Sequence, residues 1–187
     1  MREVEVKFQV RDAGKLLAAL TSHGVKLGEP LQQDDQAYAP IGWNYGDDRC
    51  GIPFARLRTV GGRHIFTLKR PRENVLSCEE HETAVDDRDE MHRAILAMGF
   101  RPTVRIIKMR RTGYLGDVLL CVDELDDLGV FLEVERMVPD DASGEAVQAE
   151  LSRLVDSLEI DAERVELTYD SLIRRAGATA VGPSQSR

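Results

Sequence analysis

The chain of 187 residues carries 25 Lys and Arg against 33 Asp and Glu, a formal net charge of −8 at pH 7. This length suits one domain with a sizeable core, or one domain with a tail. The acidic balance argues against a general nucleic-acid or anionic-membrane surface, because either would need a basic patch. No apolar run approaches the roughly 20 residues of a membrane span, and a strand pattern near the first residue leads us to expect no signal peptide.

The three cysteines, Cys50, Cys78 and Cys121, lie far apart and form no CxxC pair. This usage is typical of reduced thiols in a cytosolic protein, so we expect a cytoplasmic location without disulfides or thiolate metal sites. The four histidines show no metal-ligand spacing, and we expect surface or structural roles for them. They are His23, His64, His81 and His92.

The first ten residues, MREVEVKFQV, alternate charged and apolar side chains, which is the period of a β-strand. Glu3, Glu5 and Lys7 therefore share one face of the strand, and apolar side chains occupy the other. Taken alone, this pattern fits an ordinary half-buried strand whose charged face is solvated. A Glu-x-Glu alternation returns in residues 77–85 and 130–138, which favours a sheet with one charged surface.

Further elements follow in chain order. Period-two patterns and a Gly-Gly turn predict strands near residues 36–38 and over 54–60, 63–70, 77–85, 104–112, 117–125 and 130–138. Apolar stripes at helical spacing predict helices over 12–24, 87–98, 140–158 and 167–176. In the long loop over 40–53, Trp43 and Tyr45 either pack or cover a bound base. Residues 1–175 form the predicted domain, and residues 176–187 a tail expected to be disordered.

The charged and apolar faces together predict an α+β fold. Amphipathic helices would cover the apolar faces, so the charged faces would point away from the helices. About eight antiparallel strands could close into a β-barrel with a charged lumen and helices packed outside. So many charges would be costly in a dry interior, but a water-filled tunnel that holds a ligand tolerates them. The alternative is an open sheet whose charged face is solvated and carries surface ion pairs.

Two sets of charged residues define the candidate site. Six bases suit a polyanion with several phosphates, although each could instead pair with a carboxylate. They are Lys7, Arg56, Arg58, Lys69, Lys108 and Arg110. Clustered carboxylates suit a hard divalent cation, Mg²⁺ or Mn²⁺, which takes oxygen ligands and bridges phosphates. The metal candidates are Glu3, Glu5, Glu80, Glu82, Asp123, Glu133 and Glu135, of which Glu80 and Glu82 could instead orient the bases.

These residues carry a family resemblance. Glu3-Val-Glu5-Val-Lys7 resembles the ExExK signature of the CYTH superfamily, the triphosphate tunnel metalloenzymes, and the likeness covers roughly residues 1–175. The family's later motifs follow in order as Asp35-Gln36-Ala37-Tyr38, Arg56-Leu57-Arg58, Thr67-Leu68-Lys69, Glu80-His81-Glu82, Lys108-Met109-Arg110 and residues 123–135. Two positions depart from the pattern, because Cys78 stands where many relatives have Arg, and Ala39 where an aromatic residue is usual.

The resemblance implies an eight-stranded antiparallel triphosphate tunnel and a metal-dependent enzyme. Residues 166–173 are most similar to class IV adenylate cyclases of the CyaB type, which convert ATP to cyclic AMP and pyrophosphate. Relatives that hydrolyse tripolyphosphate, thiamine triphosphate or nucleoside triphosphates give the second hypothesis, and a non-catalytic polyphosphate or nucleotide binder the third.

The resemblance also suggests catalytic residues and partners. Lys69, Tyr38 and Lys7 are the catalytic candidates, because a Tyr–Lys pair poises water in some hydrolytic relatives. A packing role for Tyr38 is the alternative. ATP or another triphosphate is the expected partner, with no nucleic acid or membrane, and the likeness is compatible with a homodimer.

Overall fold

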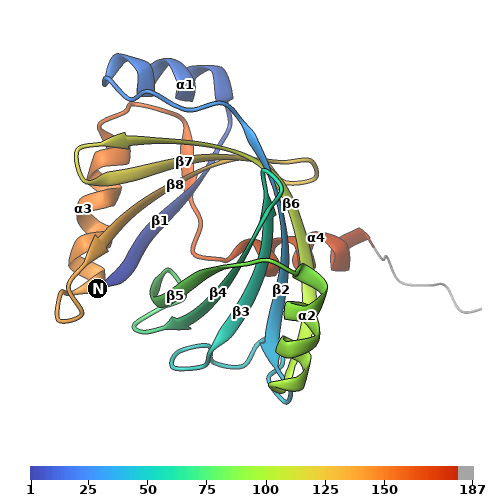
Figure 1. Ribbon diagram of the computed structural model, residues 1–187. Coiled ribbons are helices and arrows are strands. Elements are labelled where there is room, and N and C mark those ends of the chain that lie inside the picture. The colour runs from blue at the N-terminus through green and yellow to red at the C-terminus, as the bar shows by residue number, and fades with distance from the viewer. Residues whose placement is uncertain (181–187) are drawn as a thin grey trace, which may run out of the picture.

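The computed structural model describes residues 1–180, which form an antiparallel sheet accompanied by four helices (Figure 1). The strands are β1 (Arg2–Val10), β2 (Leu31–Pro40), β3 (Phe54–Val60), β4 (Arg63–Pro71), β5 (Ser77–Val85), β6 (Phe100–Leu115), β7 (Val118–Leu125), β8 (Gly129–Val138) and β9 (Ala162–Arg164). The helices are α1 (Ala13–Ser22), α2 (Arg88–Ala97), α3 (Gly144–Asp156) and α4 (Tyr169–Ala180). Within the described part of the chain, no helix is long and apolar enough to cross a membrane.

Eight of the strands close into a ring. Neighbouring strands hydrogen-bond in the order β5-β4-β3-β2-β6-β7-β8-β1, and a further pairing joins β1 back to β5. This closing seam is short, because it pairs Glu3 with Cys78 and Val4 with Ser77. The predicted ring of eight antiparallel strands is confirmed. β9, which pairs with the other end of β1, lies outside the prediction because three residues are too short to show a period.

Local sequence signals set the ends of several elements. Asp12, Asp87 and Ser143 each accept a hydrogen bond from a backbone amide of the first turn and so cap α1, α2 and α3. The third helix therefore begins later than its apolar pattern predicts. Gly61 and Gly62 both have positive φ, 55° and 75°, as the tight turn between β3 and β4 requires.

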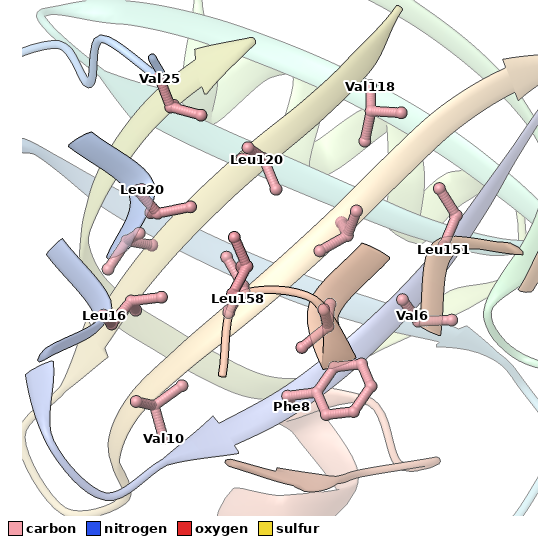
Figure 2. Close-up of a cluster of buried hydrophobic side chains, with 14 residues drawn as sticks. Val6, Phe8, Val10, Leu16, Leu20, Val25, Val118, Leu120, Leu151 and Leu158 are labelled. Carbon is pink, nitrogen blue, oxygen red and sulfur yellow. The ribbon is translucent and has the colours of Figure 1, made fainter. Parts of the chain in front are cut away.

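The largest apolar core lies outside the ring. Figure 2 shows side chains from β1, β7 and β8 facing those of α1 and α3. Members of this core include Val6, Phe8, Leu120, Leu16, Leu20 and Leu151. Fully burying each large aliphatic side chain stabilises the fold by about 1.5–3 kcal/mol. Because successive side chains on a strand alternate in direction, burying this face turns the charged face into the lumen.

α4 differs from the other helices because it packs on the inner side of the ring. Its Leu172 lies in a cluster with Ile106 and Phe131, which are two residues along their strands from predicted lumenal charges. α4 thus covers one end of the ring. The helix continues to Ala180, so the first residues of the predicted tail are helical, and residues 181–187 lie outside the described residues.

Candidate active site

The ring encloses a cavity of about 410 Å³ with a charged wall. All six predicted bases line it, as do six of the seven predicted carboxylates. The seventh carboxylate, Asp123, lies behind the wall and is fully buried. The charged lumen is therefore confirmed, and the alternative of an open, solvated sheet is wrong.

Asp123 on β7 organises two of the bases. It accepts hydrogen bonds from Lys108 Nζ at 2.8 Å, from Arg110 Nε at 2.6 Å and from the Tyr169 hydroxyl at 2.8 Å. These donors occupy its oxygens, so the structure separates Asp123 from the other metal candidates. Arg110 also pairs with Glu133 on β8, the strand on the other side of β7. Burial, followed by the charge of Arg110, lowers the pKa of Lys108.

The two arginines of β3 are held in different ways. Arg58 donates two hydrogen bonds to Asp35 on β2, from Nε and from Nη2, each at 2.7 Å. Burial acts to raise the pKa of Asp35, but the hydrogen bonds and charge of Arg58 outweigh it and lower that pKa. Arg56 donates to Thr67 at 3.1 Å and to Glu82 at 3.4 Å. Arg56 is thus less tightly bound than Arg58 and freer to reach a ligand.

Lys69 on β4 lies between two carboxylates. Its Nζ is 3.4 Å from Glu3 Oε1 and also pairs with Glu80 on the neighbouring strand. Burial acts to lower the pKa of Lys69, but Glu3 and Glu80 together raise it, so the ammonium stays charged. Burial raises the pKa of Glu80 to about 7 against the attraction of Lys69. These contacts favour an orienting role for Glu80.

Three carboxylates from β1 and β8 form the candidate metal centre. One oxygen from each of Glu5, Glu133 and Glu135 lies within 4.8 Å of the others. Burial and the neighbouring Glu133 carboxylate raise the pKa of Glu5 to about 8, and burial and Glu3 raise that of Glu135 to about 7. Burial also acts to raise the pKa of Glu133, but the nearby lysines and Arg110 hold it well below its usual range.

The three-carboxylate cluster fits a hard divalent cation. Its donors are all carboxylate oxygens, the ligand type that Mg²⁺ and Mn²⁺ prefer. Burial, together with neighbouring carboxylates, raises two of the three pKa values, so a cation would replace protons that this site otherwise holds. Lys7 Nζ lies 3.1 Å from Glu133 and 3.8 Å from Glu5, which places a phosphate-binding candidate beside the cluster.

The predicted Tyr38–Lys69 pair is wrong. The Tyr38 hydroxyl instead forms a 2.7 Å hydrogen bond with Nδ1 of His92 on α2, and its ring packs with Leu57 and Ile95 outside the ring. Because Asp35 faces the lumen, a spacing of three residues along β2 places Tyr38 on the opposite face. In the structure Tyr38 packs outside the ring and does not contact Lys69.

Two lumenal residues lie outside the predicted set. Tyr169 opens α4 and places its ring 4.2 Å from Lys7 Nζ and 4.7 Å from Lys108 Nζ. Arg49, from the loop between β2 and β3, donates to the hydroxyl of Thr168 at 3.0 Å and lines the cavity. Periodicity gives no signal for either residue, because neither lies on a strand. The resemblance of residues 166–173 to cyclases was the available signal for Tyr169.

The loop aromatics and histidines have structural roles. Trp43 packs edge-on against Phe54 at 4.9 Å and against Tyr45 at 5.0 Å, and it is buried. These two aromatics pack together, and Trp43 also lines the cavity. His92 holds Tyr38, and the other histidines lie in the loop after α1 or on outer strand positions.

Comparison with known proteins identifies the family. Residues 1–169 match the model of the CYTH domain. The chain belongs to the CYTH domain family. Membership of this family explains why the sequence motifs occur in the order found along this CYTH domain. The ring that carries those motifs is the family's fold.

Individual relatives agree with this assignment. A Methanocaldococcus jannaschii protein named "putative adenylate cyclase" is 26% identical over 88% of this chain and 94% of its own length. The structure of a Vibrio parahaemolyticus protein with the same name has a TM-score of 0.75 at 19% identity, covering 93% of this chain and 98% of that one. A Hippeastrum protein, a "putative adenylyl cyclase" described as having a dominant triphosphatase activity, has a TM-score of 0.60 at 14% identity, covering 94% and 96%.

Proposed function

We propose that this CYTH domain is a divalent-metal-dependent enzyme that acts on a triphosphate held in the ring, and that it converts ATP to cyclic AMP and pyrophosphate. The observation that carries the proposal is the meeting, in one cavity, of six bases with a cluster of three carboxylates. A protein that only binds anions would need the bases alone, because nearby carboxylates would repel the anion and weaken its binding. Carboxylates beside them suit a metal–triphosphate complex.

Glu5, Glu133 and Glu135 would hold Mg²⁺ or Mn²⁺, which would supply positive charge against the charge that develops during transfer. Arg56, Arg58 and the other lumenal bases would bind the β- and γ-phosphates. Their positive charge stabilises the pyrophosphate as it leaves, because they are fixed in place before the reaction begins. Asp35 and Asp123 keep these bases oriented when no ligand is bound.

Cyclisation needs positioning more than it needs a bound water. The ribose 3′-hydroxyl attacks the α-phosphorus, a new P–O bond forms, and the bond between the α-phosphorus and the bridging oxygen breaks. The proton of the hydroxyl leaves with the pyrophosphate. Holding both groups of one molecule in line is a large part of such a reaction. Lys7 on β1 and Lys69 on β4 would fix the chain of phosphates. The outward position of Tyr38 removes the Tyr–Lys pair expected of a hydrolytic site, which favours cyclisation.

The cavity has room for more than a bare triphosphate. Its volume of about 410 Å³ lies within the range of about 300–1,000 Å³ that is usual for sites of drug-sized organic ligands. The relative in Methanocaldococcus jannaschii also carries a cyclase name. Triphosphate hydrolysis is the second candidate, because the Hippeastrum protein with the same fold is described as having a dominant triphosphatase activity.

The decisive experiment is a product assay. The protein is incubated with ATP, and separately with tripolyphosphate, under Mg²⁺, Mn²⁺ or EDTA, and products are resolved by ³¹P NMR. We expect cyclic AMP and pyrophosphate from ATP, with no product in EDTA. Orthophosphate as the only product would refute cyclisation and establish the triphosphatase.

A matched pair of variants tests the metal site. Glu133→Gln removes a charge from the three-carboxylate cluster, and we expect turnover to fall by at least about 100-fold, as for loss of a key electrostatic group. Glu124→Gln removes a charge from the exposed outer face of β7 and should leave turnover unchanged. Equal turnover in both variants would remove Glu133 from the mechanism.

A further inference from the structure

The charged lumen ends in an aromatic surface. Phe54 lies on the lumenal face of β3, two residues before Arg56 and opposite Lys69 on β4. Trp43 stands perpendicular to Phe54, with ring centroids 4.9 Å apart and an angle of 88° between the rings. A ligand whose phosphates reach Arg56 and Lys69 would therefore bring any attached group close to these rings.

Arg49 lies over this aromatic surface. Its guanidinium carbon is 4.2 Å from the centroid of Phe54 and 5.4 Å from that of Trp43. Nη1 donates to Thr168 Oγ1 at 3.0 Å and lies 3.3 Å from Asp170. These contacts tie the loop between β2 and β3 to the start of α4 and fix the plane of the guanidinium.

Arg49 differs from the six bases of the strands. Its charge is offset by a carboxylate, Asp170, as theirs are, but its guanidinium lies against the ring of Phe54. The side chain lines the cavity, where a planar guanidinium backed by a phenyl ring offers a stacking surface.

We propose that Arg49 determines which triphosphates this lumen accepts: it selects those that carry a planar heterocyclic group, by stacking on that group. This inference rests on the proposed function, because it assumes that the strand bases hold the phosphates. A bare tripolyphosphate presents nothing to Arg49. The substrate class is therefore nucleoside triphosphates rather than inorganic polyphosphates.

Binding of two probes tests the proposal. Tripolyphosphate and an ATP analogue with a methylene group between the α- and β-phosphorus are titrated calorimetrically, under Mg²⁺, into wild type, Arg49→Lys and Arg49→Met. Stacking of one base on a side chain contributes about 1–3 kcal/mol, so we expect both variants to bind the ATP analogue at least about tenfold more weakly. Tripolyphosphate should bind within about twofold of wild type, especially to Arg49→Lys, which keeps the charge.

The controls separate selectivity from damage. Arg63→Met removes an exposed arginine of the β3–β4 hairpin and should alter neither affinity. Equal weakening of both probes by Arg49→Lys, or unchanged binding of the analogue, would overturn the proposal. So would a wild-type protein that binds only tripolyphosphate.

Failure of the proposed function gives different results. If wild type binds both probes but the product assay shows no turnover of ATP or tripolyphosphate, the enzyme proposal fails, and the two affinities still decide the role of Arg49. If wild type binds neither probe, both proposals fail.

Discussion

Asp123→Asn should destabilise the protein far more than a surface substitution of the same kind. Asp123 is 0% exposed and accepts hydrogen bonds from Lys108, Arg110 and Tyr169. The amide cannot neutralise two buried cations, and removing one partner of a buried ion pair costs about 3–5 kcal/mol. A domain is stable by only about 5–15 kcal/mol, so the loss would be a large share of the total.

The measurement is urea unfolding followed by the fluorescence of Trp43, the single tryptophan, which is buried. The free energy of unfolding comes from the midpoint and slope of each curve. Asp34→Asn is the matched control. Asp34 accepts a similar pair of hydrogen bonds from Arg105, at 2.8 and 2.7 Å, but the Arg105 side chain is 60% exposed. We expect a loss of about 0–1 kcal/mol there.

A loss for Asp123→Asn no larger than that for Asp34→Asn would refute this reasoning. It would mean that water or rearranged carboxylates neutralise Lys108 and Arg110 once Asp123 is gone. The orienting role given to Asp123 would then have to be withdrawn, although its place in the ring would not change.

Three further predictions follow from the site. Raised pKa values of Glu5, about 8, and Glu135, about 7, mean that the metal-free folded state holds protons that the unfolded state releases above about pH 4.5. Metal-free stability should therefore fall as pH rises from about 5 to 8, while Mg²⁺ affinity rises. Stability that climbs with pH in EDTA, or calorimetric affinity independent of pH, would contradict this. Tyr38→Phe removes a hydroxyl outside the lumen and should lower the free energy of unfolding by about 1 kcal/mol. Turnover should stay within about twofold of wild type, and a loss of turnover would show that Tyr38 takes part in the mechanism. Tyr169→Phe removes a hydrogen-bond donor to the buried Asp123 carboxylate, so turnover should fall and the free energy of unfolding should drop by about 1.5–3 kcal/mol. Unchanged kcat would limit Tyr169 to packing.

Much of the ring could be predicted because a strand has a simple period. Alternation in residues 2–10 places Glu5 and Lys7 on the face opposite Val6, and the structure shows that arrangement. The same rule, applied strictly along β2, would have placed Tyr38 opposite Asp35. The family motif contains both Asp35 and Tyr38, so the prediction placed them together although they are an odd number of residues apart. In the structure Tyr38 packs under α2.

The remaining features depend on long-range contacts that carry no local signal. The ring closes through two residue pairs between β1 and β5, separated by more than 70 positions in sequence. Arg49 reaches the lumen from an irregular loop because Thr168 and Asp170, far along the chain, hold it there. Neither periodicity nor composition can show such a contact before the chain is folded.

The charge inventory of the lumen explains why metal and triphosphate would bind together. Seven bases, the six of the strands and Arg49, face nine carboxylates around or directly behind the cavity, since Asp35 and Asp170 join the seven predicted ones. When all are ionised the site carries a net charge of −2, and a triphosphate entering alone would add to that negative charge. One divalent cation on Glu5, Glu133 and Glu135 restores neutrality and leaves bases to face the phosphates. Without the cation, protons on Glu5 and Glu135, whose pKa values are raised, reduce the negative charge instead. Glu133 stays ionised because Lys7 and Arg110 lower its pKa. The carboxylates and the bases thus neutralise one another, which lowers the cost of burying either set until a ligand binds.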